Sequence, residues 1–92
     1  MSGLDGEIRI PENVLFNEVA GEAVLLNLDS GRYFALNEVG ARLWQLLAEH
    51  RRLAPVLEQM LTEYEVTAEQ LRADVEPLIE ELLAQGLLVR GE

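Results

Sequence analysis

The pattern of apolar and polar positions changes period near residue 37. Before it, short runs of about six residues alternate or are rich in β-branched and aromatic residues, which is typical of strands. Turn residues separate these runs at Ala20-Gly21 and at Asp29-Ser30-Gly31, where Gly31 suits a left-handed position. The pattern therefore predicts an antiparallel meander of three strands, over residues 14–19, 22–27 and 32–36.

After residue 37, apolar residues recur every three or four positions, which predicts three amphipathic helices. Asn37 is a suitable N-cap for the first helix, which ends near His50. The second helix covers about residues 54–64, although it begins at Leu53-Ala54-Pro55 without the expected Ser or Thr cap. The third begins at Thr67, whose capping box is completed by Gln70, and it ends at Gly86.

Three strands followed by three helices predict an α+β fold that is winged helix-turn-helix-like, with its three-stranded antiparallel sheet at the front. Residues 1–11 are expected to be a loose N-terminal segment, and residues 12–92 the folded domain. Residues 7–10 alternate like a short strand, but Pro11 restricts such a strand to an edge. Gly40 inside the first helix indicates close packing against another element, such as the sheet.

The charge balance argues against several classes of partner. The chain has 92 residues, with 17 Asp and Glu against 7 basic residues and a formal net charge of −10. Nucleic acids and anionic membranes bind mainly through clustered Lys and Arg, so neither is expected as a partner. No apolar run approaches the roughly 20 residues that span a bilayer, and no signal peptide is visible, so we expect a cytoplasmic protein.

Residues that could carry catalysis are scarce. There is no cysteine, His50 is the one histidine, and serine occurs only at Ser2 and Ser30. The carboxylates are scattered and lack a calcium-loop spacing, and the glycines form no phosphate-binding pattern. We therefore expect no catalytic residues, no metal site and no cofactor.

The predicted meander offers a way to bind a peptide. Its edge strands carry unpaired backbone groups, to which an extended peptide can add as a further strand. In the third strand, Phe34 and Leu36 alternate together and are expected to pack in the core. Tyr33 and Ala35 then face the other way and are better placed to contact a ligand. Core packing is also the favoured interpretation of Trp44.

The segment 30–44, with the sequence SGRYFALNEVGARLW, resembles the PqqD-like family, in particular the stand-alone recognition proteins of lasso-peptide biosynthesis. The resemblance extends over about residues 12–90. It implies a RiPP recognition element, a domain that binds the leader of a ribosomally synthesised precursor peptide. The family binds that leader as an added antiparallel strand between the third strand and the third helix.

Carried over to this chain, the resemblance implies a binding strand from Arg32 to Leu36 and a helical wall on the third helix. The implied peptide-binding residues are Arg32, Tyr33, Phe34, Ala35, Leu36, Asp74, Leu78 and Glu81. The implied leader has an aromatic residue, a proline and a leucine at fixed spacing. The implied partners are this leader, a transglutaminase-like leader peptidase and an ATP-dependent cyclase. The chain itself would be a non-catalytic adaptor that delivers the leader to the modifying enzyme.

Three alternatives stay open at this point. The same fold serves as a peptide chaperone in pyrroloquinoline quinone synthesis, where it presents a precursor to a radical SAM enzyme. A winged-helix transcription regulator is disfavoured because the third helix carries Arg72 as its one basic residue among several acids. A structural module that pairs with itself through its open strand edge is the third alternative.

Overall fold

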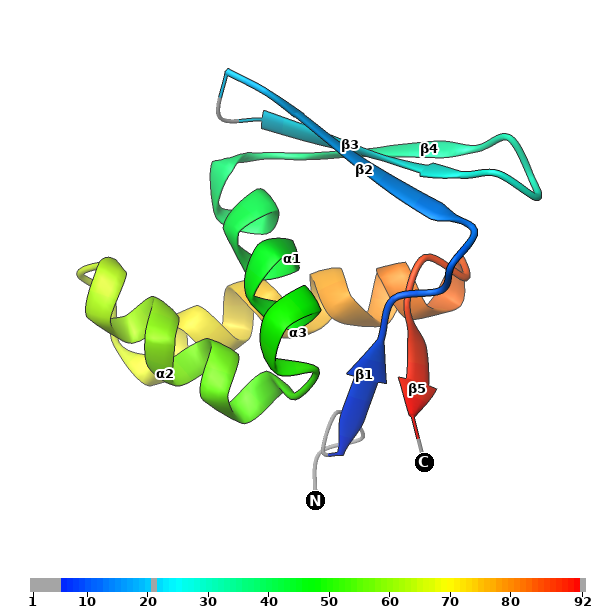
Figure 1. The fold of residues 1–92 in the computed structure, drawn as a ribbon. Helices are drawn as coiled ribbons and strands as arrows, with labels where there is room; N and C mark the ends of the chain where they lie inside the picture. The colour runs from blue at the N-terminus through cyan, green and yellow to red at the C-terminus, as the bar shows by residue number, and fades with distance from the viewer. Residues whose placement is uncertain (1–5, 21, 92) are drawn as a thin grey trace.

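The computed structural model describes residues 6–20 and 22–91, and it has the predicted α+β architecture. A three-stranded sheet lies on one side of three helices, and a second, two-stranded sheet lies at the other end of the molecule (Figure 1). The elements in chain order are β1 (Glu7–Arg9), β2 (Val14–Val19), β3 (Glu22–Asn27), β4 (Tyr33–Leu36), α1 (Glu38–His50), α2 (Leu53–Glu63), α3 (Ala68–Ala84) and β5 (Val89–Gly91).

The three-stranded sheet is the predicted antiparallel meander, in the order β2-β3-β4. The loop between β3 and β4 is organised by the buried side chain of Asn27. Its Oδ1 accepts hydrogen bonds from the backbone N–H groups of Asp29, at 2.9 Å, and Ser30, at 3.2 Å. Gly31 follows with φ +75°, which confirms the predicted left-handed position. Of the other predicted turn, Ala20-Gly21, Ala20 has φ 55°, and Gly21 lies outside the described residues.

The predicted helix caps are present. The Asn37 side chain accepts a hydrogen bond from the Gly40 N–H at 2.9 Å, and the Thr67 hydroxyl accepts one from the Gln70 N–H at 3.1 Å. At the start of α2 the N-cap is Arg52, and its side chain makes no capping hydrogen bond. This agrees with the missing Ser or Thr noted in the sequence, and α2 begins one residue earlier than predicted.

The helices pack on one face of the three-stranded sheet, and the core lies between them. Leu25 of β3 and Leu36 of β4 are buried there, and α1 is the helix that contacts this sheet face. Gly40 fits against Leu36, because a Cβ at residue 40 would lie 3.2 Å from the Leu36 Cδ2 atom. Trp44 is buried, as expected, and stacks on Phe16 of β2 with ring centroids 6.4 Å apart.

The N-terminal segment is more ordered than the sequence suggested. Residues 7–9 were expected to be part of a loose segment, but they form β1, which pairs antiparallel with β5. Ile8 is buried in the core, and its N–H donates to the Arg51 carbonyl at 2.7 Å. The expectation of a loose segment over 1–11 is therefore wrong for residues 7–9. Residues 1–5 lie outside the described residues.

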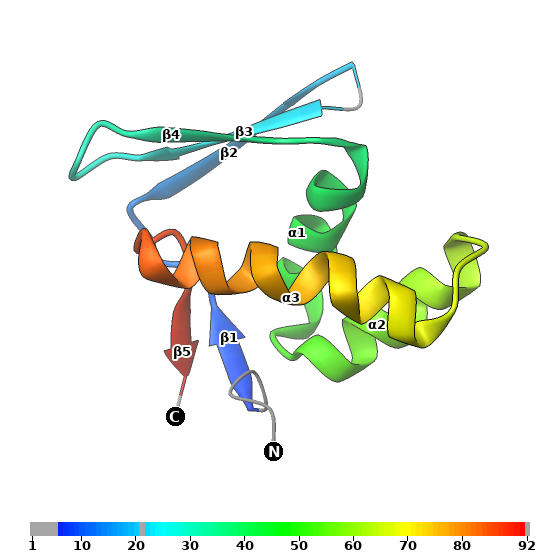
Figure 2. The same ribbon diagram turned by 180° about the vertical axis from the view of Figure 1, so that it is seen from behind.

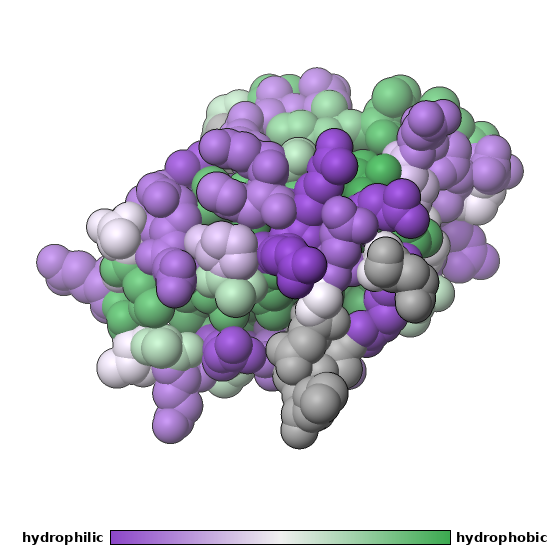
Figure 3. Space-filling view, turned by 60° about the horizontal axis from the view of Figure 1, so that its bottom comes forward, coloured by the Kyte–Doolittle hydropathy of each residue, from purple (hydrophilic) through white to green (hydrophobic). Residues whose placement is uncertain are grey.

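The end of the molecule that carries β1 and β5 is polar. Hydrophilic side chains cover much of this face (Figure 3). The exposed residues there include basic ones from β1, from the turn between α1 and α2, and from β5, namely Arg9, Arg51, Arg52 and Arg90. Most of the chain's basic residues are therefore concentrated away from the three-stranded sheet.

Candidate peptide-binding groove

β4 is an edge strand whose second side is open. Its hydrogen bonds to β3 begin where the Asn27 N–H donates to the Arg32 carbonyl at 2.9 Å, which makes residues 27 and 32 a hydrogen-bonded pair. In an antiparallel ladder such pairs alternate, so Phe34 and Leu36 also bond toward β3. The N–H and C=O groups of Tyr33 and Ala35 therefore point toward the open edge. These are the groups to which an added strand would bond.

The β4 side chains alternate as the sequence predicts. Tyr33 is 74% exposed and Ala35 is exposed, while Phe34 is half-buried and Leu36 is 3% exposed. Leu36 packs in the core and its backbone bonds toward β3, so it contributes by fixing the strand in place rather than by direct contact with a ligand. Arg32, which precedes the strand, is exposed at the start of the open edge.

α3 forms a second wall on the β4 side of the sheet. Two opposite views show that it passes on this side, below β4 and roughly along it (Figures 1 and 2). Its C-terminal end comes close to the loop before β4, since a Cβ on Gly86 would lie 4.0 Å from the Asn27 Nδ2 atom. The space between an open strand edge and a neighbouring helix is a setting in which an extended peptide can bind.

The three predicted wall residues lie along one side of α3. Leu78 is half-buried and packs against the core, so it offers an apolar contact. Asp74 and Glu81 are exposed, and each accepts a hydrogen bond from a glutamine four residues away, Gln70 at 3.0 Å and Gln85 at 3.2 Å. Because these bonds are exposed and local, a ligand can replace them at little cost.

The strand residues and the helix residues do not bond to each other. Within residues 6–20 and 22–91, no hydrogen bond or ion pair joins residues 32–36 to Asp74, Leu78 or Glu81. Both walls are instead held by the core behind them, in which Phe34 and Leu78 both take part. A ligand that binds between β4 and α3 would therefore have no hydrogen bond or ion pair between these residues to break.

Hydrogen bonds between polar side chains join α1 to α2 and to β2. Arg42 of α1 donates two hydrogen bonds to the Glu63 carboxylate of α2, at 2.8 and 2.6 Å. The hydrogen bond from Arg42, with a further one from Gln59, lowers the pKa of Glu63 to about 2. Gln45 of α1 donates to the Glu18 carboxylate of β2 at 2.9 Å. No local sequence pattern predicts these bonds, because the bonded residues lie 21 and 27 positions apart.

The described part of the chain contains no grouping of metal-binding side chains. Over residues 6–20 and 22–91, no three His, Cys, Asp or Glu residues lie together in a way that could hold an ion. His50 is exposed at the end of α1, in the polar part of the molecule and away from the groove. Nor does any described helix combine the length and apolar character that crossing a membrane requires.

Comparison with known proteins identifies the family of this chain. The model of the family "Coenzyme PQQ synthesis protein D (PqqD)" matches residues 22–88, which span β3, β4 and all three helices. The chain belongs to the PqqD family. A comparison with curated protein sequences gives no significant match.

Two solved structures with a PqqD-like fold contain a bound leader peptide. One is "TbiB1 in Complex with the TbiA(beta) Leader Peptide", at 32% identity and a TM-score of 0.81, covering 87% of this chain and 93% of the other. The second is "Lasso peptide synthetase B1 complexed with the leader peptide", at 27% identity and a TM-score of 0.80, covering 91% and 99%. The structural likeness extends beyond the family match to most of this chain.

Proposed function

We propose that this PqqD-family protein is a non-catalytic adaptor that binds the leader of a lasso-peptide precursor in the groove between β4 and α3. The observation that carries the proposal is the open β4 edge beside α3, in a chain whose solved relatives are leader-peptide complexes. The leader would add to β4 as an antiparallel strand and bond to the backbone of Tyr33 and Ala35. Such an adaptor acts in the cytoplasm, where precursor peptides are made.

Specificity must come from side chains, because backbone pairing accepts many sequences. Leu78 would contact an apolar leader residue, and burial of one such side chain contributes about 1.5–3 kcal/mol. Asp74 and Glu81 are suited to a basic leader residue, but an exposed ion pair contributes at most about 1 kcal/mol. Leu78 is therefore expected to matter more for affinity than either acid.

The bound leader would be delivered to a transglutaminase-like leader peptidase, and its precursor to an ATP-dependent cyclase. Presentation of a precursor to a radical SAM enzyme in pyrroloquinoline quinone synthesis is the second candidate. It is favoured by the family description, whereas the leader-bound lasso peptide synthetase B1 favours the lasso pathway. A winged-helix regulator is disfavoured, because α3 is acidic and four of the seven arginines, Arg9, Arg51, Arg52 and Arg90, lie at the other end of the molecule.

Calorimetric titration with a leader peptide tests this function. Leu78→Ala is expected to weaken binding by about 10- to 100-fold, the equivalent of 1.5–3 kcal/mol, and Asp74→Asn by less than about fivefold. Leu83→Ala is the matched control, because Leu83 is also half-buried on α3 but lies on another side of the helix. Amide-shift mapping should locate the perturbation on residues 32–36 and 71–82. Shifts confined to α2 or β2 would contradict the proposed groove.

The lasso leader and the quinone precursor peptide are titrated in parallel. Tighter binding of the lasso leader than of the quinone precursor is the expected result. The reverse order of affinity would assign the chain to the second candidate.

A further inference from the structure

The three-stranded sheet has a second face that the helices leave open. The side chains on this outer face alternate with those in the core and are mostly apolar: Leu15, Val19, Val24, Leu26, Tyr33 and Ala35. Leu15 is 51% exposed, Val19 68% and Val24 41%. Cross-strand pairing places Leu26 between Leu15 and Tyr33, and Val24 between Asn17 and Ala35. A contiguous apolar patch of this kind marks an interaction surface.

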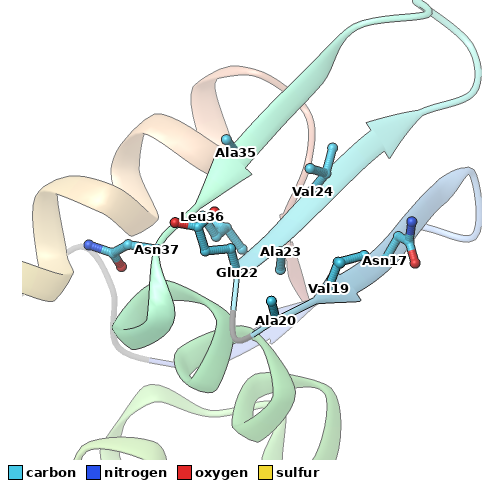
Figure 4. Close-up of a pocket in the computed structure, with 9 residues that line it drawn as sticks. All are labelled: Asn17, Val19, Ala20, Glu22, Ala23, Val24, Ala35, Leu36 and Asn37. Carbon is cyan, nitrogen blue, oxygen red and sulfur yellow. The ribbon is translucent and has the colours of Figure 1, made fainter.

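The outer face is hollowed where β2 and β3 approach their shared turn. The hollow has a volume of about 520 Å³, and its lining includes Val19, Val24 and Ala35 (Figure 4). Alanines at positions 20 and 35 leave space that larger side chains would fill. Glu22 lies on its border, so the apolar hollow has a carboxylate at its rim. These dimensions suit one bulky apolar side chain that is accompanied by a basic group.

We propose that the outer face of the three-stranded sheet is the docking surface for the enzyme that processes the bound leader, and that this enzyme presents a bulky apolar side chain among Lys or Arg residues. The inference rests on the proposed function, because it assumes that a leader occupies the β4 edge. It adds a second binding surface on the same sheet, distinct from the groove.

Continuity between the two surfaces identifies the occupant. A strand added to β4 extends the sheet, and every second leader side chain then lies on the outer face beside Tyr33 and Ala35. A protein that covers this face would contact the sheet and the leader together. Its affinity would therefore be higher for the loaded adaptor than for the empty one, which is a useful property for an enzyme that acts on the leader.

The charge argues against a second copy as the occupant. Each chain has a formal net charge of −10, so a dimer would bring together two acidic molecules and place Glu22 of each chain near the interface. The negative charge of this chain would repel a second copy, but it would attract an enzyme that has basic residues around its contact surface. The acidic surface therefore favours a basic partner of a different kind.

Val24→Glu tests the inference, because Val24 lies in the middle of the outer face on β3 and away from the open β4 edge. Val89→Glu is the matched control, since Val89 is also a strand valine and is also 41% exposed, but it lies in β5 at the other end of the molecule. The probe is the purified leader peptidase of the same pathway, titrated into each variant with and without leader peptide. Circular dichroism and thermal unfolding establish that each variant is folded.

The expected result has three parts. First, the wild-type chain with leader binds the peptidase at least tenfold more tightly than the wild-type chain alone. Second, Val24→Glu weakens peptidase binding at least tenfold. Third, Val89→Glu keeps the peptidase affinity within about twofold of wild type. Leader affinity, measured on the chain alone, stays within about twofold of wild type for both variants, so a failure of the groove and a failure of the outer face give different results.

Two results would overturn the inference. One is wild-type affinity of Val24→Glu for the peptidase in the presence of leader. The other is a wild-type dimer in light scattering that Val24→Glu converts to a monomer, because the outer face would then be a contact between copies of this chain.

Discussion

Proline at residue 35 should strongly weaken leader binding while the fold survives. The Ala35 N–H points to the open edge of β4 and is not part of the ladder with β3, so the domain loses no hydrogen bond of its own. Proline is tolerated in edge strands on the side that faces solvent. Phe34, which precedes it, is already in an extended strand, the conformation that a residue before proline prefers.

The size of the affinity loss can be estimated from the leader carbonyl that loses its hydrogen-bond donor. In the complex the Ala35 N–H would donate to a leader carbonyl, and without it that carbonyl is left desolvated and unpaired. Removal of one partner from such a bond costs about 1–3 kcal/mol, equivalent to about 5- to 150-fold in affinity. The proline ring also occupies space that the added strand needs, so the upper part of this range is expected.

Titration of a fluorescently labelled leader into Ala35→Pro measures the loss, and thermal unfolding measures the fold. Ala35→Val is the control, because it keeps the N–H while enlarging the side chain. Phe34→Pro provides the contrast: it removes an N–H on the side that bonds to β3, and it should lower the unfolding temperature. Wild-type leader affinity of Ala35→Pro, together with a loss of affinity in Glu18→Pro, would refute the reasoning and place the leader on the open edge of β2.

Two further predictions concern stability. Asn27→Ala removes the acceptor for the N–H groups of Asp29 and Ser30 and should lower the free energy of unfolding by about 1–3 kcal/mol, measured by urea denaturation, with Asn27→Asp retaining most of it. A normal unfolding curve for Asn27→Ala would contradict this role. Glu63→Gln should be less stable than wild type at neutral pH, because the pKa of Glu63 is lowered to about 2 from 4.5 in the folded state. This contribution is present above pH 4.5 and is lost as the pH falls toward 2, so the two urea midpoints should converge over that range.

The sequence predicted the elements whose signals are local. The N-caps Asn37 and Thr67 and the left-handed Gly31 each depend on residues within a few positions of one another, and all three are present. Pro77 is a position where the local signal is overridden, because it lies within α3 although proline in a helix interior costs about 3 kcal/mol. The apolar stripe of α3 continues past it and is buried on both sides.

The pairing of β1 with β5 could not be predicted in this way. It joins residues about 80 positions apart, and each strand is only three residues long, so neither carries a period that a local pattern can establish. In the site, the alternation of Tyr33 and Ala35 with Phe34 and Leu36 was predictable. The direction in which the N–H and C=O groups of β4 point was not predictable, because it depends on the hydrogen bond between Asn27 and Arg32 across the loop.

The small β1–β5 sheet also bears on how this domain can be combined with others. Glu7 pairs with Gly91, so the chain enters and leaves the fold side by side, at the end of the molecule opposite the three-stranded sheet (Figure 1). A polypeptide joined to either terminus would begin at this end of the molecule. It would therefore leave both the β4 edge and the outer face unobstructed. The same fold is therefore suited to act as a separate subunit or as one module of a larger enzyme, with no rearrangement of its binding surfaces.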